Sequence, residues 1–177
     1  MMSLQKIALG GGCHWCTEAI FLSLIGVEKV EQGYVSSTDE NSSFSEAVIL
    51  HFNKEKIPLE ILIEIHLLTY KSTSNHSMRT KYRSAIYTFD EAQEKKIQEQ
   101  LEVLQSKFQN KIITQVLPFV SFKPSREQIQ NYYFKNPNKP FCESFINPKL
   151  QMLLSEFKTY SDLNKLKHLD QNEAYET

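Results

Sequence analysis

Three consecutive glycines stand directly before a cysteine near the start of this chain. The 177 residues include only five glycines, and three of them are Gly10, Gly11 and Gly12. A residue this scarce, repeated at one strand-to-helix junction, indicates unusual backbone angles or the close approach of a ligand. Cys13 then falls at or near the N-terminus of the next helix, where free N–H groups and the helix dipole stabilise an anion. We therefore predict a Cys13 thiolate with a lowered pKa; the alternative is a turn before a buried structural cysteine.

Cys13 and Cys16 also form a Cys-x-x-Cys pair, which has two competing interpretations. It is either a thioredoxin-like redox couple or half of a zinc site. A zinc site needs further cysteines or histidines at matching spacing. The histidines outside the motif are scattered singly and there is no second Cys-x-x-Cys, so the zinc interpretation is disfavoured.

The two residues between these cysteines have chemistry of their own. His14 stands next to the nucleophile, where it is either a pocket wall or proton donor, or an exposed histidine of the first helical turn. Trp15 is the only tryptophan of the chain. Between two cysteines and behind three glycines, it is expected to line a pocket for an apolar group of the substrate.

The composition excludes several classes of function. Twenty basic residues stand against 21 acidic ones, a net charge of −1, so no basic excess points to nucleic acid. The apolar stretch 61–68 is interrupted by Glu64 and His66 and is too short for a membrane span. Three cysteines make a poor disulfide framework, and residues 1–12 lack the apolar core of a signal peptide. We therefore expect a cytoplasmic protein without a membrane or nucleic-acid partner.

Strands and helices that alternate along the chain must position these residues. Strand-like runs occur at 6–9, 27–35, 47–52, 84–89 and 112–116. Helical patterns cover 17–25, the residues after Pro58, those after the N-cap candidate Asp90, 125–133, and 149 to about 166.

This order predicts an α+β fold with one two-layer domain over residues 1–169. We expect a mixed sheet with packed helices, a ferredoxin-like βαββαβ-type core, and an irregular C-terminal arm that carries Cys142. Residues 170–177 are expected to form a polar tail.

Five blocks in this sequence together resemble a known enzyme family. The run Gly11-Gly12-Cys13-His14-Trp15-Cys16 is similar to the Gly-Cys-Phe-Trp signature of the A-type peptide methionine sulfoxide reductases. The other blocks are Gly26-Val27 with Gly33-Tyr34, Ser45-Glu46-Ala47-Val48, the run from Thr80 to Tyr87, and Asn136-Pro137 with Phe141-Cys142. Each block alone is weak, but their shared order is specific.

The resemblance implies reduction of methionine S-sulfoxide, free or in damaged proteins, to methionine. Cys13 would be the nucleophile that attacks the sulfoxide sulfur. Trp15, with His14 in place of the usual phenylalanine, would cage the methyl group, and Tyr34 would help to bind the substrate.

The resemblance also implies a proton donor and a resolving thiol. Glu46 would protonate or hydrogen-bond the sulfoxide oxygen, which is a poor leaving group until it is protonated, and Tyr82 would share that oxygen. Cys13 would become a sulfenic acid, and Cys142 would condense with it to a disulfide. An external dithiol, thioredoxin by analogy with the family, would reduce that disulfide, so no metal or organic cofactor is implied.

The chain departs from the family pattern at three places. His14 replaces phenylalanine, the loop between Tyr34 and Glu46 lacks a second tyrosine, and Ser77 stands where the family has an acidic residue. These losses favour a slower or differently selective enzyme.

Several alternatives stay open. The chain could be a thioredoxin-like oxidoreductase that uses Cys13 and Cys16, or a catalytically weakened sulfoxide-binding module. Cys16 would otherwise be a packing residue or a backup resolving thiol. Glu46 could be an exposed strand residue, Tyr82 a surface aromatic, and Cys142 an idle thiol.

Overall fold

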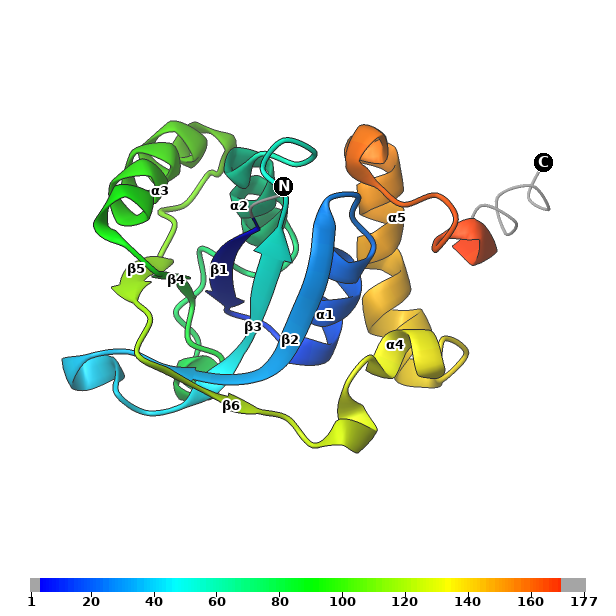
Figure 1. Ribbon diagram of the computed structural model, residues 1–177, viewed down its shortest axis with the longest axis horizontal. Helices are drawn as coiled ribbons and strands as arrows, with labels where there is room; N and C mark the ends of the chain where they lie inside the picture. The colour runs from blue at the N-terminus through cyan, green and yellow to red at the C-terminus, as the bar shows by residue number, and fades with distance from the viewer. Residues whose placement is uncertain (1–3, 170–177) are drawn as a thin grey trace.

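Six strands form one sheet in the computed structural model, which describes residues 4–169 (Figure 1). They are β1 (Gln5–Gly10), β2 (Val27–Ser36), β3 (Ser45–Phe52), β4 (Ala85–Thr88), β5 (Gln115–Pro118) and β6 (Ser121–Pro124). Their order across the sheet is β5-β4-β1-β3-β2-β6. Neighbours are antiparallel except β4 and β5, which are parallel, so the sheet is mixed as predicted.

The helices follow the predicted order around the four central strands. They are α1 (His14–Leu22), α2 (Leu59–Leu68), α3 (Glu91–Leu104), α4 (Tyr132–Lys135) and α5 (Asn147–Glu156). The run β1-α1-β2-β3-α2-β4 is a βαββαβ unit, and its strands lie side by side as β4-β1-β3-β2. The predicted α+β fold with a ferredoxin-like core is confirmed, and β5 and β6 extend the sheet at its two edges.

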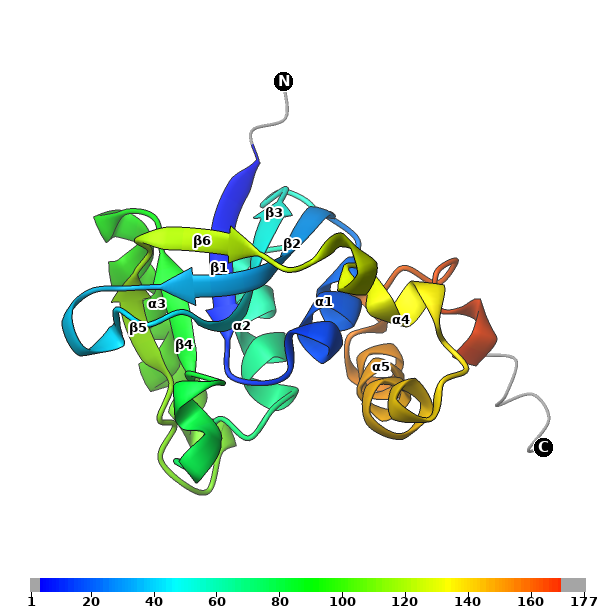
Figure 2. The same cartoon turned by 90° about the horizontal axis from the view of Figure 1, so that it is seen from below.

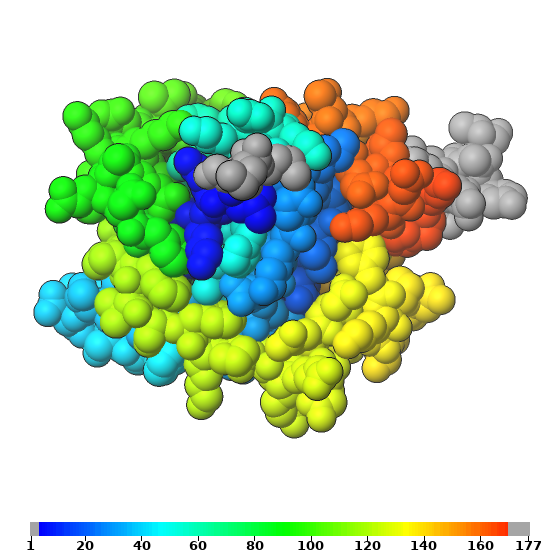
Figure 3. Space-filling model, in the orientation of Figure 1, coloured from blue at the N-terminus to red at the C-terminus, as the bar shows by residue number. Residues whose placement is uncertain are grey.

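The two faces of the sheet are covered differently. Side chains alternate between the faces along a strand, so Val48 and Leu50 of β3 join the buried cluster that includes Phe21 of α1 and Ile63 of α2. The other face holds a smaller cluster with Ala8, Val35, Ala47, Ile49, Ala85 and Tyr87. Figure 2 shows α1 and α2 on one side of the sheet, and in Figure 3 the blue strands stay visible from the opposite side.

The C-terminal segment returns to α1. Cys142 opens a π-helical turn, Cys142–Ile146, which continues directly into α5. This turn, α4 and α5 all pack against α1, as Figure 2 also shows. A segment far along the chain is thereby brought beside the helix that begins after Cys13.

Some predicted boundaries were wrong, each for a local reason. Segment 125–133 is not one helix, because Asn131 has a left-handed φ of 54° and α4 begins only after it. The last predicted helix ends at Glu156, since Phe157 leaves helical geometry. The fifth strand begins only at Gln115, and the N–H of Ile113 binds the Ser72 carbonyl outside the sheet.

The remaining differences are smaller. The short edge strand β6 was missed, and α1 begins and ends three residues earlier than predicted. The predicted polar tail, 170–177, lies outside the described residues.

Candidate active site

Cys13 occupies the N-cap position of α1, directly before its first helical residue, His14. Its carbonyl accepts the N–H of Thr17 and the Thr17 hydroxyl, both at 3.1 Å, which closes the first turn. The N–H groups of Trp15 and Cys16 are then free to donate hydrogen bonds to the Cys13 sulfur. The helix N-terminus that the sequence predicts therefore lies at the nucleophile candidate.

These contacts favour the thiolate form of Cys13. The pKa of Cys13 is lowered overall from 9.0 to about 6, and the largest cause is the hydrogen bond from the Cys16 thiol, which burial opposes. The N–H groups of Trp15 and Cys16 contribute to the same lowering of the Cys13 pKa, and the charge of Glu46 opposes it. Donation to Cys13 raises the pKa of Cys16 in turn, so Cys16 stays a protonated thiol.

The glycine turn is shaped by a tyrosine ring of the protein itself. Gly11 has a φ of 146°, and a Cβ added there would meet Cε2 of Tyr70 at 2.4 Å. The Tyr70 hydroxyl lies 2.7 Å from both the Ser84 and Thr114 hydroxyl oxygens, which fixes the ring. The unusual backbone angle that the sequence predicts is present, and the group in close approach is a side chain.

A buried histidine supports the same turn. Nε2 of His66 donates to the Gly10 carbonyl at 3.0 Å, and the His66 ring packs on Tyr70 with 4.6 Å between centroids. Burial lowers the pKa of His66 to about 3, so the ring is neutral near pH 7. His66 is therefore a structural donor.

Arg79 joins the glycine turn to the loop that carries Tyr82. Its guanidinium donates to the carbonyls of Gly11 at 2.7 Å, Tyr82 at 2.9 Å, Lys71 at 2.6 Å and Ser74 at 2.9 Å. The sequence analysis missed this residue, because nothing in its local pattern distinguishes it from a surface arginine. Ser77, noted there as a replacement, is exposed on the turn Ser77–Thr80 that precedes Tyr82.

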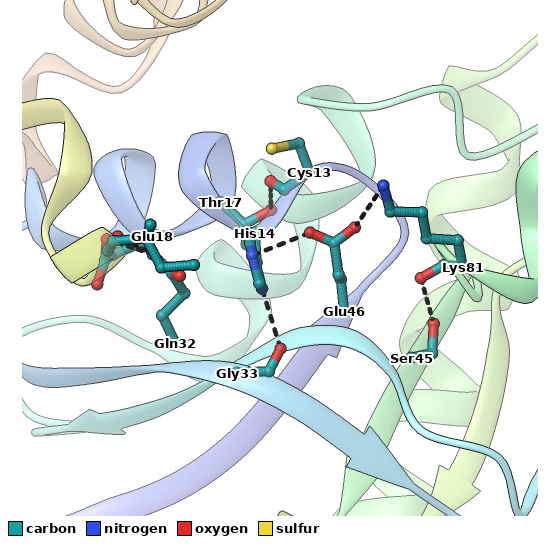
Figure 4. A network of polar contacts seen from close by, with 10 residues as sticks. Cys13, His14, Thr17, Glu18, Gln32, Gly33, Ser45, Glu46 and Lys81 are labelled. Atoms are coloured by element: carbon teal, nitrogen blue, oxygen red, sulfur yellow. Dashed lines mark hydrogen bonds and ion pairs between the residues drawn. The ribbon is translucent and has the colours of Figure 1, made fainter. Parts of the chain in front are cut away.

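Glu46 is buried near the start of β3. The register of β2 and β3 places Tyr34 opposite Glu46, on the helix-covered face of the sheet. The Glu46 side chain is 7 % exposed; Oε1 lies 3.0 Å from Nε2 of His14, and Oε2 lies 4.0 Å from Nζ of Lys81 (Figure 4). Among residues 4–169, no hydrogen-bond donor reaches Oε2.

His14 points toward the sheet and is 3 % exposed. Its Nδ1 lies 3.0 Å from the Gly33 carbonyl oxygen, and its ring meets Tyr34 edge-on at 5.4 Å. Burial lowers the pKa of His14, but the hydrogen bond and the charge of Glu46 outweigh it, so the pKa is raised overall. Of its two interpretations in the sequence analysis, the exposed first-turn histidine does not fit this burial.

A cavity of about 780 Å³ opens beside Cys13, a size that suits a small-molecule site. Its lining includes Cys13, Tyr70, Met78, Tyr82 and Met152. Burial raises the pKa of Tyr82, and the charges of Glu46 and Cys13 add to this against a hydrogen bond with Lys81. The Tyr82 hydroxyl therefore stays protonated and able to donate.

Trp15 and Cys142 lie where α1 packs against the C-terminal segment of the chain. The Trp15 ring is half-buried, stacks on Tyr132 with 4.2 Å between centroids, and meets Phe141 edge-on at 5.6 Å. Cys142 is fully buried, which raises its pKa, and its charge acts on Cys16. All three cysteines are free thiols.

Within residues 4–169, no group of three or more His, Cys, Asp or Glu side chains is placed to hold a metal ion. No helix in that range is long and apolar enough to cross a membrane.

Comparisons with known proteins agree on one family. The family model described as peptide methionine sulfoxide reductase matches residues 5–161. The peptide methionine sulfoxide reductase MsrA of Trichodesmium erythraeum (strain IMS101) is 35% identical over 170 residues, covering 87% of this chain and 96% of that protein.

Solved structures of the Saccharomyces cerevisiae protein Mxr1 share the fold. Its reduced form has a TM-score of 0.70 at 25% identity and covers 78% of this chain and 89% of the other. Mxr1 in complex with Trx2 has a TM-score of 0.59 at 24% identity, covering 73% of this chain and 84% of the other.

Proposed function

Since the chain belongs to the peptide methionine sulfoxide reductase family, we propose that it reduces methionine sulfoxide to methionine with Cys13 as the nucleophile. The observation that supports this most is the lowered pKa of Cys13, about 6, at a helix N-terminus beside a cavity. A thiolate there is available at neutral pH, where an ordinary thiol is mostly protonated.

In the first step, the Cys13 thiolate attacks the sulfoxide sulfur. One proton goes to the sulfoxide oxygen, and the resulting hydroxyl is transferred from the substrate sulfur to the Cys13 sulfur. The substrate sulfur–oxygen bond and the transient sulfur–sulfur bond break, which leaves Cys13 as a sulfenic acid and releases methionine. Thiolate, sulfoxide and one proton thus become sulfenic acid and thioether, which balances atoms and charge. Glu46 supplies the proton, and Tyr82, on the cavity wall, donates a hydrogen bond to the same oxygen.

In the second step, a thiol condenses with the sulfenic acid to give a disulfide and water. We assign this role to Cys142, whose π-helical turn packs against α1. Cys142 is fully buried in the hydrophobic cluster that contains Cys16 and against which Cys13 packs. Cys16, as a protonated thiol donor, has its role in stabilising the thiolate.

The substrate pocket uses aromatic side chains. We propose that Trp15, which follows the nucleophile closely in the chain and stacks on Tyr132, cages the methyl group, and that Tyr34 lies on the buried side opposite Glu46. His14 is directed at Glu46 and the sheet, which removes it from contact with the methyl group.

We further propose thioredoxin as the reductant, since Mxr1 forms a complex with Trx2. Disulfide exchange with this dithiol returns both cysteines to thiols, so the cycle requires no metal or organic cofactor. The S epimer is the proposed substrate, free or within oxidised proteins. Three free cysteines fit a reducing compartment, and we propose that this compartment is the cytoplasm. We also propose that the chain forms a single catalytic domain.

A single-turnover experiment tests this proposal. One equivalent of methionine sulfoxide is added to the reduced enzyme without reductant, methionine is quantified, and the cysteine pairing is mapped by mass spectrometry. We expect about one methionine per enzyme and a Cys13–Cys142 disulfide; Cys13→Ser should form none.

Two further variants separate the alternatives. Cys142→Ser should still form one methionine and leave a sulfenic acid that dimedone traps, while Cys16→Ser should form the disulfide as usual. If Cys16→Ser instead abolishes turnover and Cys142→Ser does not, the chain is a Cys-x-x-Cys oxidoreductase. Absence of methionine even with excess dithiothreitol would identify a binding module.

A further inference from the structure

A neutral histidine and an ionised glutamate share one side-chain hydrogen between them, on the imidazole. The contacts of His14 and Glu46 require a second one. Nδ1 of His14 lies 3.0 Å from the Gly33 carbonyl oxygen, and a carbonyl only accepts, so Nδ1 carries a hydrogen. Nε2 lies 3.0 Å from Oε1 of Glu46. A neutral imidazole with hydrogen on Nδ1 would direct its Nε2 lone pair at a carboxylate, which is repulsive. A hydrogen bond at this distance therefore requires a proton between Nε2 and Oε1.

The shared proton can lie on either Nε2 of His14 or Oε1 of Glu46. With the proton on nitrogen the pair is imidazolium and carboxylate; with the proton on oxygen it is neutral imidazole and carboxylic acid. The net charge is zero in both forms. Both side chains are almost fully buried, 3 % and 7 % exposed, so the neutral pair is favoured over an isolated buried carboxylate.

The second carboxyl oxygen of Glu46 is left for another partner. Oε2 is buried and has no hydrogen-bond donor among residues 4–169, and the nearest cation, Lys81 Nζ, is 4.0 Å away. In Figure 4 the Glu46 carboxyl group lies between His14 and Lys81, near the start of α1 that carries Cys13. A buried carboxyl oxygen without a hydrogen-bond donor lowers the stability of the folded protein, unless a bound ligand donates a hydrogen bond to it.

We propose that His14 and Glu46 act as one two-residue acid, in which His14 keeps a proton on the pair and Glu46 delivers it to the sulfoxide oxygen. This rests on the proposed function and deepens it. His14 is a positioning residue, since it acts through Glu46 and does not touch the substrate. The pair starts neutral, loses one proton to the oxygen as Cys13 takes that oxygen as a sulfenic acid, and regains a proton from solvent.

The charged groups around the pair determine its titration. Glu46 is the direct partner from β3, and the Gly33 carbonyl and the Tyr34 ring face His14 from β2. The Cys13 charge raises the pKa of His14, and His14 also acts electrostatically on Glu18 one turn along α1. On the other side, Lys81 Nζ lies 4.0 Å from Oε2 of Glu46, and the charge of Glu46 helps to raise the pKa of Tyr82.

The sign of the pH effect follows from this environment. Although burial alone lowers the pKa of His14, the hydrogen bond and charge of Glu46 raise it above its ordinary value of 6.5. The pair therefore keeps its proton near neutral pH and loses it as the pH rises through this raised value. Without the imidazole, the pair lacks the group that keeps its proton, so the reaction should slow more at alkaline than at acidic pH.

The first measurement is independent of activity. NMR of protein labelled at the histidine Cε1 carbon gives the pKa of His14 directly. We expect a value above 6.5 in the unmodified protein and one below 6.5 in Glu46→Gln, where burial remains and the carboxylate is gone. A His14 pKa below 6.5 in the unmodified protein overturns the proposal.

The second measurement is the pH profile of single-turnover methionine formation. His14→Gln can keep a hydrogen bond to Glu46 but cannot titrate, and we expect its rate to fall at least about tenfold at pH 8 and much less at pH 6. His51→Gln is the matched control. His51 of β3 also pairs with a glutamate, Glu31 of β2, but on the sheet face opposite to the one that carries Glu46. Its profile should not change.

The two proposals fail in different ways. No methionine from the unmodified enzyme refutes the reductase function, while the NMR result still reports on the pair. Methionine formation with the same pH profile in His14→Gln and the unmodified enzyme refutes the acid pair and leaves the reductase function standing. Thermal unfolding of each variant confirms that a lost rate is measured on folded protein.

Discussion

Replacement of Cys16 by alanine removes the hydrogen bond that lowers the pKa of Cys13 most. A hydrogen bond to a charged group contributes about 1.5–3 kcal/mol, and one pKa unit corresponds to about 1.4 kcal/mol. We therefore expect the pKa of Cys13 in Cys16→Ala to rise by about one to two units from its value of about 6.

This shift changes the charge of Cys13 most strongly just below neutral pH. At pH 6.5, a pKa of about 6 leaves about three quarters of the Cys13 population as thiolate. A pKa near 7.5 leaves about one tenth. The backbone donors at the helix N-terminus remain in the variant, so the pKa should stay below 9.0, its ordinary value.

The assay is the pH dependence of alkylation by iodoacetamide, with the modified residue identified by mass spectrometry. The midpoint of the profile should be compared, because a thiolate of higher pKa is also more nucleophilic and its plateau rate rises. Cys16→Ser is the matched control, since its hydroxyl can still donate to Cys13, and its midpoint should stay near 6. An unmodified protein with a midpoint near 9, or an unchanged midpoint in Cys16→Ala, refutes the reasoning.

Three further substitutions test the support of the site. Gly11→Ala should lower the free energy of unfolding, measured by urea titration, by at least about 2 kcal/mol, because φ is 146° and Tyr70 blocks the new Cβ. Gly12→Ala is the control and should change this free energy far less, because the nearest atom to its new Cβ is 3.4 Å away. His66→Gln should remove part of the acid sensitivity: the pKa of His66 is lowered by burial to about 3, so its contribution is complete above pH 6.5 and lost as the pH falls. Between pH 7 and 4.5 the unmodified protein should lose about 2.5 kcal/mol more than the variant, and equal losses would contradict this. Arg79→Ala should lower the unfolding free energy by about 1–3 kcal/mol and reduce kcat/KM, since the carbonyls of Gly11 and Tyr82 lose their shared donor; steady-state kinetics with normal values would show that this link is not needed.

Features set by neighbouring residues could be predicted from the sequence. Cys13 at the N-terminus of α1 follows from glycines and a helical pattern that adjoin it, and Asp90 was recognised as an N-cap, where its carboxylate accepts the Gln93 N–H at 2.7 Å. The βαββαβ order could be predicted because three of the four central strands are largely buried runs, such as 47–52.

Features set by distant residues could not be predicted in the same way. The partner of His14 is 32 positions along the chain and is fixed by the register of β2 and β3. The left-handed conformation of Asn131 and the π-helical turn at Cys142 depend on how the C-terminal segment packs on α1, and no local pattern encodes them. Arg79 binds four carbonyls, and one of them, that of Gly11, is 68 positions away from it in the sequence.

The pairing of Tyr34 with Glu46 also determines where the chain can be lengthened. Paired residues run from Val35 and Ser45 back along β2 and β3, and this pairing sets the direction of the Glu46 carboxylate. The hairpin tip beyond that pair includes Asp39–Asn41, protrudes at the left of Figure 1 and does not set this direction. A tag or epitope grafted into that tip leaves the reaction centre in place. One residue inserted at 46, by contrast, turns the acid to the helix-free side of the sheet, because successive side chains alternate.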